Sequence, residues 1–191
     1  EFVPETEMAG RPIYQAVPKG APVPIEDGRS AADLLGNDYM HQELNRIQSA
    51  IVDDPALALG TAKELIETCC KTILDKLAVP YSASAEMSTL SKAVLANLDL
   101  DPAGAGIEKT LKSLLGGLSN IPPKLAELRN SHGSGHGKGG SFEALEPHHA
   151  RLAVTSAIAY IGFVTEAYRR RAESTVEPAA GVTLLDEEVP F

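Results

Sequence analysis

The sequence predicts an all-α fold, a bundle of four or five helices, on three observations. Apolar residues recur at helical spacing through residues 30–172, and strand signals are absent from the same stretch. Asp54-Pro55 and Asp101-Pro102 resemble helix starts, with the aspartate as N-cap and the proline in the first turn. With 43% hydrophobic residues and no tryptophan in 191 residues, we expect one domain with a largely aliphatic core.

The first 28 residues are predicted to form an extended arm, because prolines interrupt them at five positions. These prolines are Pro4, Pro12, Pro18, Pro22 and Pro24. A helix is then predicted from Ser30 or Asn37 to Val52. Its apolar stripe, spaced by four, three and four residues, consists of Met40, Leu44, Ile47 and Ile51.

The strongest helix prediction in the chain runs from Pro55 to Leu77, and Pro80 ends it. Its stripe includes Cys69, whose neighbour Cys70 lies about 100° further around the helix. The two thiols are therefore poorly placed to form a disulfide and are predicted to be small buried side chains. This cysteine usage, with no membrane-spanning apolar run and no secretory signal, favours a cytoplasmic protein.

A shorter helix is predicted from Ser88 to Leu98. The next begins at Asp101-Pro102 and is expected to kink or break at Gly116-Gly117 and Pro122-Pro123. It resumes as Lys124–Asn130, which places an arginine near its C-terminal end.

Beyond this helix, residues 131–141 are predicted to form a glycine-rich loop. Pro147 starts the last helix, which is predicted to reach Ala172. The chain therefore divides into an arm at 1–28, a helical domain at 29–172 and an acidic tail at 173–191.

The net charge of −9 alone argues against a nucleic-acid binder, but its distribution does not. Residues 1–60 carry 4 basic and 10 acidic side chains, and residues 61–100 carry 4 and 5. Residues 101–172 carry 9 and 6, whereas residues 173–191 carry 5 acidic and no basic side chains. Residues 101–172, which include Arg129, are therefore the positively charged part of an acidic protein.

Arg129, Asn130, His132 and His136 form the cluster best suited to chemistry. Arginine binds phosphate through a planar donor fork, and histidine exchanges its proton near neutral pH. In metal-free RNA cleavage, His136 can be the general base or acid and Arg129 the cation that stabilises the phosphorane. Asn130 can orient the imidazole or the phosphate. One histidine does not easily perform both proton transfers, so a second copy of the chain is an attractive complement.

Three other interpretations compete with this one. In the first, the glycine-rich loop at 131–141 is a flexible surface linker, and Arg129 only caps the C-terminal end of a helix. Alternatively, four histidines bind zinc: His132, His136, His148 and His149. However, the glycines disfavour a helix there, and only two carboxylates are close, so no metal is predicted. A phosphate-binding loop is disfavoured because Gly133–Gly140 lacks the P-loop order and follows no strand.

Other residues are assigned supporting roles. His132, His149, Arg151 and Glu64 are placed around the site, with Glu64 either on a solvated face or bridged to Arg129. Lys138, Arg169 and Arg170 are assigned to RNA contacts, although helix dipoles also favour cations at this C-terminus.

Three segments occur in the order seen in the abortive-infection C-terminal domain family, which is similar to the HEPN superfamily of helical ribonucleases. They are Gly60–Glu67, Leu128–Gly137 and His149–Val154. The resemblance covers about residues 55–172. The superfamily motif is an arginine, often a following polar residue, and a histidine after four to six residues. Arg129, Asn130 and His136 match it with six intervening positions.

The resemblance implies a HEPN-like bundle and a cytoplasmic, metal-independent endoribonuclease without cofactor. It further implies a homodimer whose motifs face each other and cleave RNA in phage defence (abortive infection) or a toxin-like system. A cognate sensor or antitoxin protein is a candidate further partner. The alternative is a non-catalytic helical module that binds RNA or protein in a defence system.

Overall fold

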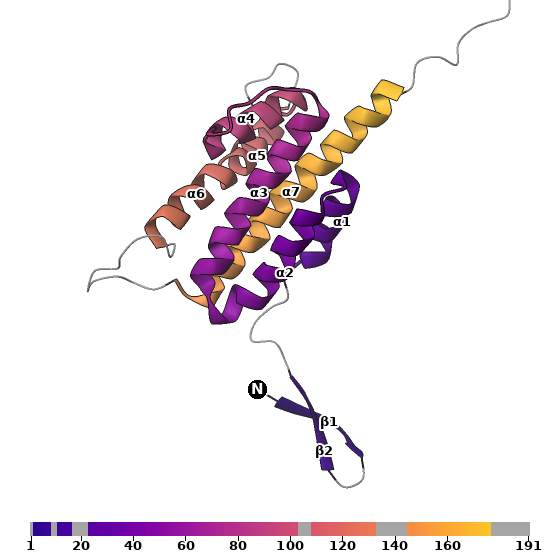
Figure 1. Cartoon of the computed structure of the whole chain (residues 1–191), viewed down its shortest axis with the longest axis vertical. Helices are drawn as coiled ribbons and strands as arrows, with labels where there is room; N and C mark the ends of the chain where they lie inside the picture. The colour runs from indigo at the N-terminus through magenta and orange to yellow at the C-terminus, as the bar shows by residue number, and fades with distance from the viewer. Residues whose placement is uncertain (1, 9–10, 17–22, 103–107, 133–144, 177–191) are drawn as a thin grey trace, which may run out of the picture.

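The computed structural model describes residues 2–8, 11–16, 23–102, 108–132 and 145–176, and it is dominated by helices (Figure 1). The elements are β1 (Phe2–Met8), β2 (Arg11–Ala16), α1 (Ile25–Leu35), α2 (Asp38–Asp53), α3 (Pro55–Lys76), α4 (Met87–Asn97), α5 (Lys109–Ser119), α6 (Ile121–His132) and α7 (Pro147–Val176). The predicted all-α bundle is confirmed. The described part contains seven helices rather than four or five, because two predicted segments are each divided.

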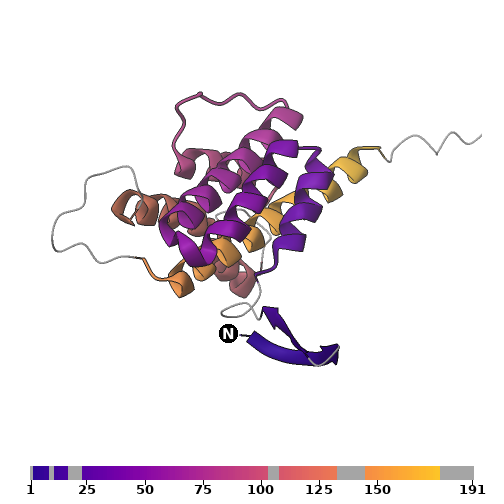
Figure 2. The same ribbon diagram turned by 60° about the horizontal axis from the view of Figure 1, so that its bottom comes forward.

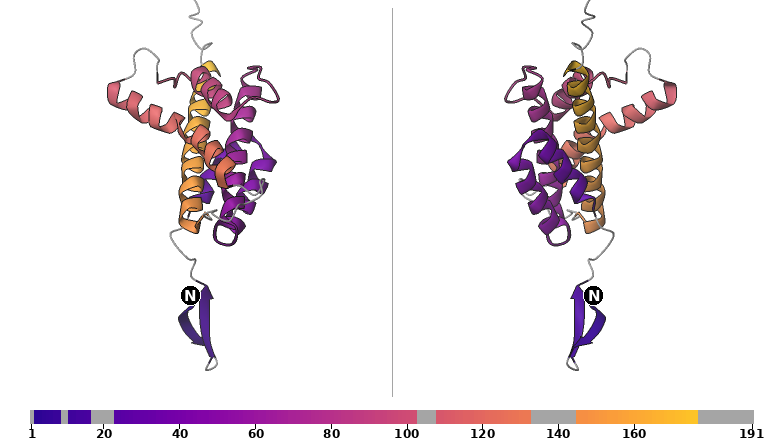
Figure 3. Two further views of the ribbon diagram at one scale, coloured as in Figure 1. Left: turned by 90° about the vertical axis from the view of Figure 1, so that its left-hand side faces the viewer. Right: turned by 90° about the vertical axis from the view of Figure 1, so that its right-hand side faces the viewer.

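The centre of the bundle is α3, which packs against α2 and α7 along its length, as Figures 1 and 2 show. On the other flank, α6 lies across α3 and also contacts α4 and α7. The largest side chains of the core are fully buried aliphatic residues together with Tyr160. By contrast, α5 projects from the bundle in Figure 3, and Leu115 is its one buried residue.

The first helical segment is divided at Gly36, whose φ of 61° suits glycine and ends α1. Asn37 then caps α2 by accepting a hydrogen bond from the Met40 amide at 3.2 Å. The start of α1 at Ile25 corrects the predicted arm, which was placed at 1–28. Gly28 lies within this helix, where a Cβ would lie 2.7 Å from Leu44 Cδ2, so a larger residue there would require the Leu44 side chain on α2 to shift.

The two described segments of the arm, residues 2–8 and 11–16, are extended, as predicted, and they pair with each other. β1 and β2 form an antiparallel hairpin in which Phe2 pairs with Ala16 and Met8 with Arg11. The pairing is irregular between Pro4 and Thr6. The proline pattern indicated an extended backbone and gave no sign of this pairing.

The prediction for α3 is confirmed. Asp54 accepts a hydrogen bond from the Leu57 amide at 3.0 Å, and Pro55 occupies the first turn. The last helix begins at Pro147, as predicted, and continues to Val176, four residues beyond the expected end at Ala172.

The segment that leads to Arg129 differs from its prediction. Helix α5 begins at Lys109 with Glu108 as N-cap, not at Asp101-Pro102, and it continues through Gly116-Gly117. Pro122 and Pro123 do not interrupt α6, because they lie in its first turn, where no amide donor is required. The prolines thus start the helix that carries Arg129.

We expect Cys69 and Cys70 to resist thiol reagents in the folded protein. Both are fully buried between α3 and α7, where Cys69 contacts Thr165 and Cys70 contacts Tyr160. Burial raises the pKa of both thiols, that of Cys70 to about 12, so almost no reactive thiolate forms at pH 8. A colorimetric thiol assay should detect both cysteines in denaturant and neither in buffer. Fast labelling of the folded chain would contradict this packing.

Candidate active site

Arg129 lies in the last turn of α6 with its side chain exposed. No hydrogen bond or ion pair joins its guanidinium to any residue in the described ranges. The other arginines of the helices each have a hydrogen-bonding, ionic or similar partner. Because a guanidinium has five donors and a permanent charge, Arg129 is available to an anionic ligand.

Arg129 and Asn130 line a groove of about 590 Å³, here called the polar groove. Three segments form it: α6, the middle of α3, and residues 83–88 at the start of α4. Asn130 is exposed, and its side chain also makes no hydrogen bond within the described part of the chain. The groove therefore presents an arginine and an amide that retain their capacity to bind a ligand.

A three-residue ion-pair network fixes one cation in the polar groove. Glu67 is bound by Lys63 and, at 2.7 Å, by Lys71, one helical turn to either side. Burial opposes the charge of Glu67, but the hydrogen bonds from the two lysines outweigh it, so the pKa of Glu67 is lowered. The network has one excess positive charge, and Lys63 and Glu67 line the groove.

This network was not identified in the sequence analysis. The Lys63-Glu67-Lys71 spacing on a predicted helix was the available signal. Glu64 was selected instead, but the structure places it elsewhere. It is half-buried and contributes, after Glu43, to the raised pKa of Tyr39 and Arg46 on α2. The optional salt bridge to Arg129 is therefore not formed.

His132 and His149 line a second groove of about 490 Å³, here called the apolar groove. It lies between α6 and the start of α7, and its other side chains are mainly apolar, including Leu125, Leu128 and Leu152. His132 is half-buried. Asn130 and His132 are two residues apart, about 200° around the helix, so the two grooves lie on different sides of α6.

The start of α7 fixes His149 and His148. The Glu146 amide donates to His149 Nδ1 at 3.4 Å, and the two imidazole rings lie 3.8 Å apart. His148 Nδ1 lies 3.2 Å from a Glu146 carboxylate oxygen. Arg151 is half-buried on the next turn and lines neither groove.

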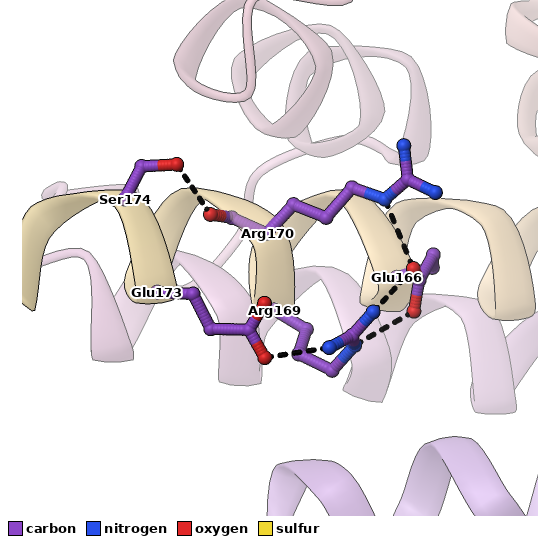
Figure 4. Close-up of polar contacts among 5 residues, drawn as sticks. All are labelled: Glu166, Arg169, Arg170, Glu173 and Ser174. Atoms are coloured by element: carbon purple, nitrogen blue, oxygen red, sulfur yellow. Dashed lines mark hydrogen bonds and ion pairs between the residues drawn. The ribbon is translucent and has the colours of Figure 1, made fainter. Parts of the chain in front are cut away.

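Arg169 and Arg170 lie towards the other end of α7, about 30 Å along the helix from His149. Figure 4 shows both guanidinium groups held by Glu166, with Arg169 also bound to Glu173. The hydrogen bonds from Arg169 and Arg170 lower the pKa of Glu166 to about 2. These arginines are not part of either groove near Arg129.

The remaining predicted residues, His136 and Lys138, lie in residues 133–144, outside the described residues. Within the described ranges, no group of three or more His, Cys, Asp or Glu side chains could hold a metal ion. None of the described helices is long and apolar enough to span a membrane.

A family model described as a HEPN-like domain, Abi_C, matches residues 38–168. The chain belongs to the Abi_C family. The match spans more than half of the chain and begins at α2, which the resemblance at 55–172 left out. Arg129 and the segment up to Gly137 lie within it. No curated protein and no solved structure matches the chain.

Proposed function

We propose that this HEPN-like protein is a metal-independent endoribonuclease that acts in phage defence or a toxin-like system. The observation that carries the proposal is Arg129, an exposed arginine without a partner among the described residues. In the sequence it begins the stretch from Arg129 to His136 that resembles the arginine-to-histidine motif of HEPN ribonucleases. Membership of a HEPN-like family supports a nuclease or defence-related role.

In the proposed reaction, His136 removes the proton of the ribose 2′-OH, and the 2′-oxygen attacks the adjacent phosphorus. The bond from phosphorus to the 5′-oxygen breaks, and a protonated imidazole returns a proton to that leaving oxygen. The products end in a 2′,3′-cyclic phosphate and a 5′-OH. Arg129 stabilises the additional negative charge on the phosphorane, and Asn130 orients the phosphate.

A second copy of the chain is the proposed source of the second imidazole. The apolar groove contains Leu152, whose side chain is 68% exposed. At Ile121 it adjoins a further apolar surface on α5, where Leu114 is 70% exposed. Such a surface is expected to be covered by a partner. A symmetric dimer through this face brings two copies of the α6 end, and of His132 and His149, close together.

We expect Arg170 to act as a secondary contact for long RNA and to be dispensable for cleavage. Its side chain is 74% exposed, but Glu166 offsets its charge. Arg170→Ala should lower the salt dependence of binding to a long RNA by about one phosphate contact. It should leave cleavage of a short oligonucleotide unchanged. A large loss of cleavage would contradict this assignment. Arg169→Ala is expected to have a similar but smaller effect, because Arg169 is also paired with Glu173.

The proposal is tested by incubating the purified protein with mixed RNA in excess EDTA. Products ending in 2′,3′-cyclic phosphate are expected, with cleavage that weakens as salt rises because the positive patch is local. An absolute requirement for a divalent metal would overturn the mechanism.

The alternative function is a non-catalytic module that binds RNA or protein in a defence system. The exposed leucines of α5 and the apolar groove favour a protein-interaction role. The two functions differ in the effect of His136→Ala on growth arrest in cells expressing the protein. The substitution abolishes the arrest if the chain cleaves RNA, whereas it leaves the arrest unchanged if the chain only binds.

A further inference from the structure

The polar groove contains a carboxylate that serves no visible structural role. Glu86 is exposed at the N-cap position of α4, yet its side chain makes no capping hydrogen bond. Glu108 provides the comparison, because at the N-cap of α5 its carboxylate accepts from the Thr110 and Leu111 amides at 2.9 Å. Within the described part of the chain, Glu86 also has no ion pair.

The other charges of the polar groove are largely compensated. Glu127 pairs with Lys124, and Glu67 is held between two lysines. Two centres of excess positive charge remain, the lysine network and Arg129, together with one uncompensated negative charge on Glu86. The groove therefore offers a site for an anion and, on the wall formed by the start of α4, a site for a hydrogen-bond donor.

A nucleotide has the same two features. Its phosphate is anionic, and adenine, cytosine and guanine each carry an exocyclic amino group, which uracil lacks. An unstacked RNA base is commonly read by hydrogen bonds to its edge. The groove volume of about 590 Å³ can hold one nucleotide, and Ser84 and Ser88 add hydroxyl groups near Glu86.

We propose that the polar groove binds the nucleobase next to the scissile phosphate and that Glu86 selects bases with an exocyclic amino group over uracil. This inference rests on the proposed ribonuclease function. Arg129 binds the phosphate, and the Glu86 carboxylate accepts a hydrogen bond from the amino group of the base. Glu86 is thus a specificity-determining residue rather than one that transfers a proton.

The test uses fluorescent 2′-O-methyl oligonucleotides of cytosine and of uracil, which cannot be cleaved because the nucleophile is blocked. The two bases have nearly the same size. They differ at position 4, where cytosine has the amino group and uracil a carbonyl oxygen that a carboxylate repels, and at N3, which accepts a hydrogen bond in cytosine and donates one in uracil. We expect the full chain to bind the cytosine oligonucleotide about tenfold more tightly, as for a hydrogen bond to a charged group. Glu86→Ala should remove this difference by weakening only the cytosine complex.

Glu26→Ala is the matched control, because Glu26 is an exposed glutamate on α1, outside the groove, and this variant should retain the preference. Thermal unfolding verifies that each variant is folded, and Glu86→Gln provides a more conservative replacement that should weaken the preference. Equal binding of the two oligonucleotides by the wild type, or a preference that persists in Glu86→Ala, would overturn the inference. A preference without any RNA cleavage would instead overturn the ribonuclease proposal alone.

Discussion

Arg129→Ala is expected to slow RNA cleavage by about 10²–10³-fold, the usual effect of removing a group that stabilises charge in the transition state. The same substitution should change the free energy of unfolding by no more than about 0.5 kcal/mol. The reason is structural, since Arg129 is exposed and no interaction joins it to the described residues.

The measurement is the single-turnover rate of cleavage, with thermal unfolding recorded on the same samples. Arg129→Lys keeps the charge but loses the planar fork, so an intermediate rate is expected. Arg171→Ala is the control, because Arg171 is a helical arginine that is paired with Asp99 and lines neither groove. If Arg129→Ala cleaved at the wild-type rate, Arg129 would have no catalytic role.

Leu152→Asp is expected to convert a dimer of about 40 kDa, twice the 20.2 kDa chain, into monomers and to abolish most of the cleavage. Leu152 lines the apolar groove beside His149 with its side chain 68% exposed. A carboxylate there costs a monomer little, but it places an unpaired charge in a dimer interface. Light scattering after size exclusion reports the mass.

Val52→Asp is the matched control. Val52 is an exposed aliphatic residue on α2, 41% accessible and away from both grooves, so this variant should remain dimeric and active. A Leu152→Asp protein that is monomeric but fully active would exclude a composite site. A wild-type protein that is monomeric at all concentrations would exclude the dimer itself.

The fold could be predicted from the sequence where capping residues and apolar periodicity within a segment mark the helix. Asp54 and Pro55 define the start of α3, and the periodic stripe that follows reaches its end. The start of α1 was misplaced, because the proline-rich arm was extended to residue 28, whereas the helix begins directly after the last of these prolines, Pro24. Pro122 and Pro123 were misinterpreted for a related reason, since their effect depends on which residue begins the helix.

The site was only partly predictable. The position of Arg129 and Asn130 near a helix end could be predicted, because it depends only on the neighbouring sequence, and both residues lie in the last turn of α6. The polar groove is not local, because it joins α3, the start of α4 and α6. Lys63, Glu67 and Glu86 were therefore missed, and Glu64 was chosen although it lies on the side of α3 that faces Tyr39 and Arg46. The assignment of His136 stays a prediction, since it lies outside the described residues.

This HEPN-like chain is proposed to cleave RNA through a ribose 2′-OH without a metal. This activity is tested most directly with a DNA oligonucleotide that contains a single ribonucleotide, a cytidine, incubated with the protein in EDTA. We expect one cut on the 3′ side of that ribose, leaving a 2′,3′-cyclic phosphate, and no cut with Arg129→Ala or His136→Ala. Cleavage at deoxyribose positions, or cleavage only when magnesium is restored, would contradict this mechanism.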